Sequence, residues 1–396
     1  MNHVSLSNYS KKGEVPTHIA IIASLMSELV DNKIDPHKAL LKIKIPHKMP
    51  RGRYCDTKSK RYKKNMELFS ESQPSQAESY INENRSEQSR ISPKIISLFS
   101  GCGGMDLGFT GGFDFLGKYY ENLGFDITWA NELNSNACKT YRENLGKEIV
   151  EGDIWDVMDS IPGEADIVIG GFPCQDISVN GNGAGINGKR SGLYRAMVEV
   201  VKRVKPKVFV AENVKGLMTK KHKADLETVI SDFSSLGYTV RYDLYNSADY
   251  GVPQTRERVL IVGTLPDMEE FVPPEALLSK DSYVTAVEAL SDLEPLAEDP
   301  SFNHIWSKAN RSPEQGDRRL KRDRAGYTIR AECHGNIQWH YSLPRRMSMR
   351  EAARIQSFPD SFIFKSKLRE TERQVGNAVP PVLAWHVASK IKSLLE

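Results

Sequence analysis

Long apolar segments are absent from this 396-residue chain. No run approaches the roughly 20 apolar residues that a membrane-spanning helix needs. The first residues, MNHVSLSNYSKKGEVP, also have no apolar core of the kind found in a signal peptide. Both absences argue against a membrane or secreted protein, and we expect the chain to work inside the cell without contacting a membrane.

Cysteine is scarce and the net charge is small. The five cysteines are widely spaced and include no C-x-x-C pair, so neither a zinc site nor a redox motif is indicated. A disulfide framework is not expected in a reducing compartment. The net charge of +3 at pH 7 does not by itself require a polyanionic partner, so a partner has to be inferred from local motifs.

The first 92 residues differ in composition from the rest. Residues 42–64 hold ten Lys and Arg against one Asp, and residues 67–92 are rich in Ser, Glu, Gln and Asn. The basic run is either a solvated tail or an arm that contacts nucleic acid. The polar stretch has the composition of a linker. We therefore expect residues 1–92 to form an N-terminal extension.

Strand-like and helix-like patterns alternate from Ile95 onward. The expected strands are residues 94–99, 125–132, 165–171, 207–214, 238–246 and 258–264. The expected helices are residues 135–144, 191–204, 223–237, 348–358 and 380–395. Such alternation predicts an α/β, Rossmann-like domain with a mostly parallel sheet covered by helices on both faces. Ligands bind such sheets at the carboxyl ends of the strands.

The alternation fails between residues 266 and 344. Several prolines, a polar stretch and the basic run RRLKRDR predict a smaller, irregular domain there. We expect residues 93–265 to form the main domain and residues 345–396 to return to it.

A glycine-rich turn follows the first expected strand. Gly101, Gly103 and Gly104 in FSGCGG let backbone amides approach a ligand at a helix N-terminus. A dinucleotide fingerprint requires glycine where Asp106 stands, which argues against a nucleotide-dependent dehydrogenase. A nucleoside without phosphates fits the motif better, and Phe99 can pack on its base.

Two carboxylates end the next two strands. Glu132 in ANE is placed to bond both hydroxyls of a ribose, and Asp153 in EGDIW is placed to accept from an adenine amino group. Taken alone, Glu132 is equally well explained as a solvated loop charge and Asp153 as a helix cap. Their occurrence at successive strand ends favours a nucleoside cofactor site.

Cys174 follows the strand in DIVIGGFPCQDIS. A lone cysteine is most often a small buried hydrophobe. Here the glycine pair before it, the adjacent proline and the glycine-rich loop after it favour a nucleophile carried on a closing loop. A thiol needs only modest help to become a reactive thiolate.

Glu212 and two arginines complete the candidate site. Glu212 ends the apolar strand KVFVA, where burial disfavours the charged form of a carboxylate and suits it to proton donation. Arg256 and Arg258 in QTRER alternate on entry to a strand, and their guanidinium groups suit a carbonyl oxygen and a phosphate. A capping carboxylate and a surface arginine pair are the alternatives.

The chain resembles the DNA (cytosine-5)-methyltransferase family, which uses S-adenosylmethionine as methyl donor. The resemblance covers residues 95–396 and rests on six motifs in the family's order: FSGCGG, GGFPCQ, ENV, QTRER, REAARIQSFPD and QVGNAVPP. One departure is Asp176, where many members have proline, but this position lies outside the catalytic Pro-Cys pair.

The resemblance implies roles for the matched residues. Cys174 would attack C6 of cytosine, Glu212 would bond N3 and the amino group, and Arg258 would hold O2. Arg256 would steady the catalytic loop or a phosphate. The cofactor pocket would be formed by Phe99, Gly101, Gly103, Gly104, Glu132, Asp153, Ile154, Phe172, Leu193 and Asn377.

The resemblance also implies double-stranded DNA as partner, with residues 266–344 as target-recognition domain. The expected DNA contacts are Gln175, Ser178, Arg318, Arg319, Lys321 and Arg322. The short single recognition region suggests a prokaryotic, cytoplasmic restriction-modification enzyme that acts as a monomer, without a stable complex with a cognate endonuclease. No metal is expected, because Cys333 and His334 have no second pair nearby.

Two other functions share these features. A transfer RNA cytosine-5 methyltransferase carries the same motifs, although the basic arm and the recognition region fit a DNA enzyme at least as well. A catalytically silent nucleic-acid-binding protein of the same fold is the other alternative. The intact Cys174, Glu212 and arginine pair argue against it.

Overall fold

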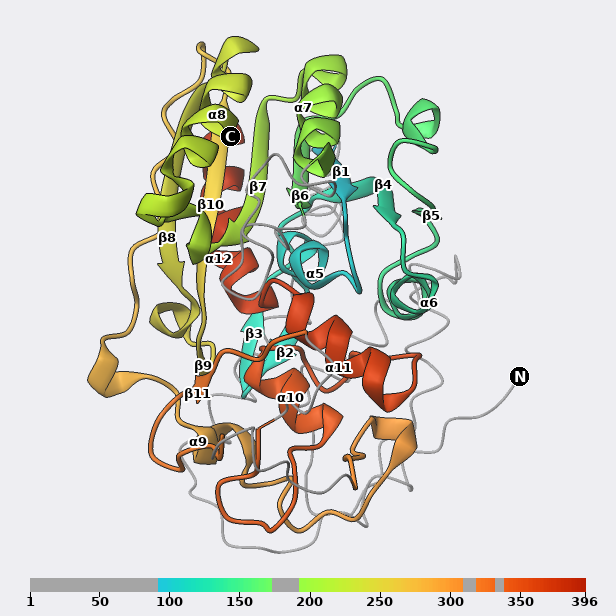
Figure 1. Ribbon diagram of the computed structural model, residues 1–396, viewed down its shortest axis with the longest axis vertical. Coiled ribbons are helices and arrows are strands. Elements are labelled where there is room, and N and C mark those ends of the chain that lie inside the picture. Colours follow the sequence, from blue (N-terminus) through green and yellow to red (C-terminus); the bar gives the residue numbers. More distant parts are fainter. Residues whose placement is uncertain (1–91, 173–191, 309–317, 332–337) are drawn as a thin grey trace, which may run out of the picture. The chain divides into compact units, whose positions relative to one another are not determined.

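A seven-stranded sheet in the order β5-β4-β1-β6-β7-β10-β8 forms the centre of the fold (Figure 1). The computed structural model describes residues 92–172, 192–308, 318–331 and 338–396. The strands from β5 to β7 are parallel, and β10 is antiparallel to both β7 and β8. The strands are β1 (Lys94–Leu98), β4 (Asp126–Glu132), β5 (Ile149–Glu151), β6 (Ile167–Gly171), β7 (Val208–Val214), β8 (Thr239–Asn246) and β10 (Glu257–Thr264).

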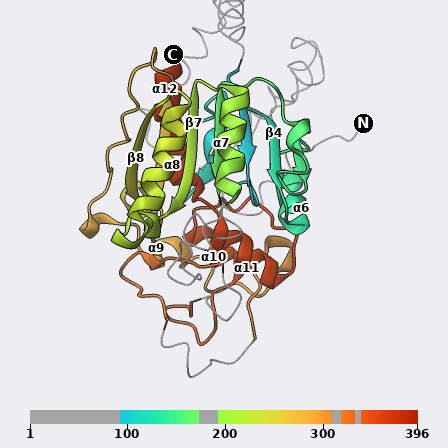
Figure 2. The ribbon, with the colours of Figure 1, turned by 45° about the horizontal axis from the view of Figure 1, so that its top comes forward.

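Helices cover both faces of the sheet, because alternate strand residues are buried on opposite sides. Helices α7 (Gly192–Val204) and α8 (Lys223–Ser235) pack on one face, against a cluster that includes Val168 and Ile261. Figure 2 shows these two helices in front of the sheet. Helices α5 (Gly104–Thr110) and α12 (Pro381–Leu395) pack on the other face with Ile95 and Ile169. Helix α6 (Ser135–Asn144) contacts β4 and β5.

The predicted α/β class and mostly parallel sheet are confirmed. Helix α6 has the expected bounds, and α7 begins one residue later than expected. The antiparallel direction of β10 was not predicted. Residues 247–256, which connect β8 to β10, are too few for the helical crossover that joins parallel strands. The small hairpin of β2 (Phe113–Phe115) and β3 (Lys118–Tyr120) was also missed.

The described part of residues 266–344 contains little regular structure. Within their described part, α9 (Ala286–Leu290) is the one α-helix, and β11 (Gly326–Tyr327) pairs with β9 (Gln254–Thr255) of the main domain. Helices α10 (Met349–Ile355) and α11 (Leu368–Asn377) follow in sequence, and Figure 1 shows all three beyond the carboxyl ends of the central strands. The short 3₁₀ helices are η2 (Met158–Ser160), η4 (Lys215–Met218), η5 (Lys220–His222), η6 (Ser247–Tyr250), η7 (Lys280–Ser282) and η8 (Pro300–Phe302).

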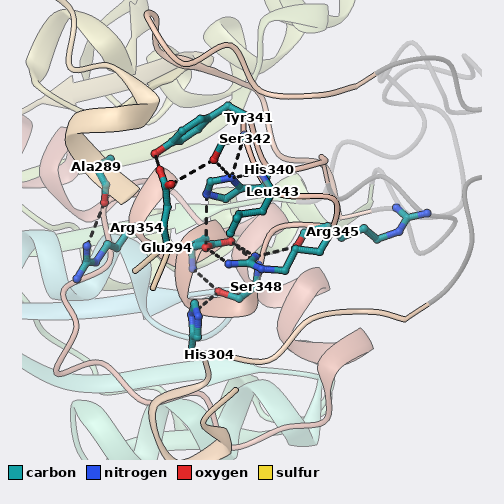
Figure 3. Close-up of polar contacts among 12 residues, drawn as sticks. Ala289, Glu294, His304, His340, Tyr341, Ser342, Leu343, Arg345, Ser348 and Arg354 are labelled. Atoms are coloured by element: carbon teal, nitrogen blue, oxygen red, sulfur yellow. Dashed lines mark hydrogen bonds and ion pairs between the residues drawn. The ribbon is translucent and has the colours of Figure 1, made fainter. Parts of the chain in front are cut away.

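Buried polar contacts join α10 to the segment before it (Figure 3). The Glu351 carboxylate accepts two hydrogen bonds from Arg345, at 2.8 and 2.7 Å. Ser348 caps α10 and bonds the His304 ring at 2.9 Å. Arg354 donates to the carbonyl of Ala289 at 3.1 Å. These contacts fix the irregular region relative to α10.

Across the described ranges, no helix is long and apolar enough to cross a membrane.

Candidate active site

A cavity of about 930 Å³ lies at the carboxyl ends of β1, β4, β6 and β7. This is where ligands bind in sheets of this kind. Its wall also includes residues 328–331 and part of α11, so elements distant in sequence close it. The cavity is lined by the predicted residues Phe99, Gly101, Gly104, Glu132, Asp153, Ile154, Phe172, Leu193, Glu212, Arg256, Arg258 and Asn377.

The glycine turn shapes one end of the cavity. Gly101 has φ +59°, and its amide donates to Glu132 Oε2 at 3.0 Å. Gly103 has φ +91° and is not among the lining residues; a Cβ there would lie 2.2 Å from Leu145 Cδ1. The structure therefore places Gly103 in the packing between the turn and the end of α6.

Glu132 and Asp153 both face the cavity, and each is held by backbone amides. Glu132 Oε1 accepts from the Asn134 amide at 2.7 Å. Burial raises the pKa of Glu132, and its amide donors oppose this shift. Asp153 Oδ1 accepts from the Trp155 amide at 3.0 Å, so this side chain also closes a local turn. Both carboxylates are thereby held in place with oxygen lone pairs left for a ligand.

Glu212 and Arg258 form an ion pair beside this site. Glu212 Oε1 lies 2.8 Å from Arg258 Nε, and Glu212 is 8% exposed. Arg258 also donates to the carbonyl of Glu257 at 2.7 Å, which limits its motion. The pair therefore presents a carboxylate and a guanidinium in one fixed arrangement at the cavity wall.

Asn213 is a functional candidate that the sequence reasoning missed. Its side-chain amide donates to the carbonyl of Phe172 at 3.3 Å, and Asn213 is 1% exposed. Phe172 is the last described residue before the loop that carries Cys174. Asn213 thus links the strand of Glu212 to the start of that loop. Its position next to Glu212 in AENV was the available signal.

Gly171 packs directly against the Glu212 carboxylate. A Cβ at Gly171 would lie 3.0 Å from Glu212 Oε2, a carboxylate already held by Arg258. We expect Gly171→Ala to displace this carboxylate and lower kcat by about tenfold to 100-fold, the effect of a misplacement on the ångström scale. Steady-state kinetics measures the change. Gly163→Ala, where a Cβ meets nothing within 4 Å, is the matched control. A wild-type rate in the first variant would contradict this packing argument.

Arg256 is buried rather than exposed to the cavity mouth. Its guanidinium donates to the carbonyls of Ile329 and Gly376, each at 2.9 Å, and the residue is 1% exposed. Burial lowers the pKa of Arg256, and the nearby Arg258 lowers it further. The sequence predicted two alternative roles for Arg256, steadying the catalytic loop or holding a phosphate. The buried position does not suit contact with a DNA phosphate. Arg256 instead joins the segment after β11 to the end of α11.

Asp106 is a second buried group that the sequence reasoning did not assign. Tyr141 Oη donates to Asp106 Oδ1 at 3.0 Å, and burial raises the pKa of Asp106 to about 6. The residue lies in the wall of the cavity and is 0% exposed. Asp106 lies in the first turn of α5 and joins that helix to Tyr141 of α6.

The predicted DNA contacts are only partly described. Cys174, Gln175 and Ser178 lie outside the described residues, as do Cys333 and His334. Among the basic residues of the recognition region, the Arg319 guanidinium donates to the carbonyls of His340 and Leu343, at 2.6 and 3.2 Å. It therefore braces its own region. Of the four basic residues predicted to contact DNA, Arg318, Lys321 and Arg322 are exposed.

The fold and the cavity define the class of protein first: an α/β protein with a ligand-sized cavity at the carboxyl edge of a mostly parallel sheet. The family model for C-5 cytosine-specific DNA methylases matches residues 93–314 and 301–393. The chain is 40% identical over 333 residues to Type II methyltransferase M.NgoFVII of Neisseria gonorrhoeae, covering 76% of this chain and 86% of that protein. It is 35% identical over 336 residues to M.MthTI of Methanothermobacter thermautotrophicus, covering 76% and 98%.

Solved structures share the fold. The S. pombe Dnmt2 methyltransferase superimposes with a TM-score of 0.55 at 20% identity, covering 76% of this chain and 98% of that one. A putative DNA modification methyltransferase from an E. coli prophage gives 0.54 at 22%, covering 77% and 99%. The chain therefore belongs to the C-5 cytosine-specific DNA methylases and is a DNA (cytosine-5)-methyltransferase of the prokaryotic restriction-modification type.

Proposed function

We propose that the enzyme binds S-adenosylmethionine in the cavity and methylates a cytosine that is flipped out of double-stranded DNA. The observation that carries the proposal is the Glu212–Arg258 pair, which shares one cavity with Glu132 and Asp153. One end of the cavity offers carboxylates for a ribose and an adenine. The other offers a carboxyl group and a guanidinium for the polar edge of a pyrimidine.

The cavity suits a nucleoside donor and a base together. Its volume of about 930 Å³ is near the upper end of the 300–1,000 Å³ typical of small-molecule sites. A Cβ at Gly101 would meet nothing within 4 Å, so the turn leaves open space beside the Glu132 carboxylate. We infer that Glu132 bonds the ribose hydroxyls, Asp153 the adenine amino group, and Phe99 the adenine face. Bound S-adenosylmethionine supplies an electrophilic methyl group.

The residues at the other end activate the cytosine. C5 of cytosine is too weak a nucleophile to take a methyl group unaided. Addition of the Cys174 thiolate forms an S–C6 bond, and a proton at N3, delivered through Glu212, makes C5 an enamine carbon. Arg258 holds O2. After C5 has taken the methyl group, loss of the C5 proton restores the C5–C6 double bond and breaks the S–C6 bond, which releases the thiolate. N3 returns its proton to Glu212, which leaves neutral 5-methylcytosine.

The burial of the site supports base flipping. Glu212 is 8% exposed, and we infer that a base within a stacked duplex does not reach its carboxylate. We assign target recognition to residues 266–344. We also infer that methylation protects DNA from a partner endonuclease. The enzyme is proposed to act as a monomer that forms no stable complex with that endonuclease. Asn303 and Asn144 hold the segment before α11 through the carbonyls of Phe364 and Ile363, at 3.0 and 2.9 Å. These contacts support a fixed platform for the recognition region.

The test is methyl transfer from tritiated S-adenosylmethionine by the full-length protein. We expect label in unmethylated duplex DNA and none in transfer RNA, because the recognition region is proposed to bind a duplex. Bisulfite sequencing of DNA from expressing cells then maps the methylated site. Label in transfer RNA alone, or in neither nucleic acid, would refute the proposal.

A further inference from the structure

A row of exposed lysines lies beside the cavity, on the side of the main domain rather than the recognition region. We call it the lysine ridge: Lys215, Lys220, Lys221 and Lys223, on η4, η5 and the first residue of α8. All four are exposed. Because α8 leads back to the start of β8, which runs parallel to β7, its first residue lies at the carboxyl edge of the sheet. Figure 1 shows α8 beside these strands.

Short contacts connect Lys215, at one end of the ridge, to the active site. Lys215 lines the cavity, and its Nζ lies 2.8 Å from Glu257 Oε1. The Glu257 carbonyl accepts from Arg258 Nη1 at 2.7 Å, and Arg258 pairs with Glu212. A strand of DNA whose base reaches Glu212 therefore has its backbone close to the ridge.

Fold stability does not account for these charges. Lys223 pairs with Glu227 at 3.7 Å, an exposed contact of the kind that contributes little. Within the described ranges, no ion pair is formed by Lys220 or Lys221. Lysines at the beginning of a helix also face the positive end of its dipole, which is unfavourable. Clustered cations of this kind are typical of surfaces that bind phosphates.

We infer that the lysine ridge binds the phosphate backbone of the DNA next to the flipped cytosine, across the cavity from the recognition region. The inference rests on the proposed function. It adds a contact surface outside residues 266–344, one that carries no sequence information because it meets phosphates alone. His222 does not take part, since its ring is buried and bonds Asp225 at 2.7 Å.

The test compares DNA affinity across salt concentrations for the full-length enzyme. Each phosphate contact contributes about 0.9 to the slope of log affinity against log salt, so K220A/K221A should lessen the slope by about 2. At 0.1 M salt its affinity for duplex DNA should fall about 10- to 60-fold. Affinity for S-adenosylmethionine and kcat at saturating DNA should stay unchanged, which also shows that the variant is folded.

Two controls make the result specific. K202A/K390A removes two exposed lysines that lie outside the ridge, on α7 and α12, and should keep the wild-type slope. K220R/K221R keeps the charges and should keep the affinity. If K220A/K221A matches K202A/K390A, the inference is wrong although wild-type methylation of DNA still supports the proposed function. Failure of the wild-type enzyme to methylate DNA would overturn the proposed function itself, and loss of affinity for transfer RNA alone would assign the ridge to RNA.

Discussion

Cys174→Ser is expected to lower methyl transfer by about 10³-fold or more, the scale seen when a covalent nucleophile is removed. A serine hydroxyl is protonated at neutral pH and is a far weaker nucleophile than a thiolate. Binding of S-adenosylmethionine and of DNA should persist, because the adenosine pocket and the lysine ridge are unchanged. Tritium transfer to duplex DNA measures the loss.

A second readout separates covalent catalysis from a structural role for this thiol. In DNA with fluorine at C5 of the target cytosine, methylation cannot end in loss of a C5 proton, so the S–C6 bond should persist. The wild-type enzyme should form a complex that survives denaturation, and Cys174→Ser should form none.

Cys138→Ser is the matched control. Cys138 is buried in α6, and burial raises the pKa of its thiol to about 12, so it is no nucleophile at neutral pH. This variant should retain both activity and trapping. Full transfer activity in Cys174→Ser would refute the covalent mechanism.

Glu212→Gln is expected to lower kcat by about 10²- to 10⁴-fold, the range of a lost general acid. Glutamine has nearly the same shape, but it cannot deliver a proton to N3. It also removes the charge that pairs with Arg258 at 2.8 Å. Affinity for S-adenosylmethionine should change little, since Glu132 ends β4 and Asp153 follows β5, away from the end of β7 that carries Glu212. Single-turnover kinetics with saturating DNA isolates this step from binding.

Glu199→Gln controls for the substitution itself. Glu199 is exposed on α7 and pairs with Lys202 at 3.5 Å, away from the cavity. It should show the wild-type rate. Combining Glu212→Gln with Arg258→Met should cost less than the product of the two single effects, because both act on one pair. An unchanged single-turnover rate in Glu212→Gln would exclude its role in proton transfer.

Much of the fold was predictable because it depends on local patterns. Buried strands such as Ile167–Gly171 form continuous apolar runs, and α7 has a clear helical stripe. The direction of β10 and the β2–β3 hairpin were not predicted, because strand pairing depends on contacts between distant residues and on the length of connections. Short helices such as α9 are likewise held by tertiary contacts.

The candidate site was likewise predictable where it depends on local motifs and unpredictable where it depends on tertiary contacts. Cys174, Glu212 and Arg258 were named from motifs, since each stands next to a strand and the residue type reports its chemistry. Motifs do not report burial. The two arginines of QTRER look alike in sequence, but Arg256 is enclosed by the carbonyls of Ile329 and Gly376 while Arg258 faces Glu212.

By itself, the sequence predicted the parallel core from short-range periodicity, and its six motifs gave the family resemblance that implied the class of chemistry and the cofactor. Only the tertiary structure decided which residues share the cavity, and that Asn213 holds the carbonyl of Phe172. These are distances between segments far apart in the chain. They depend on how strands are ordered and packed, which no local pattern encodes.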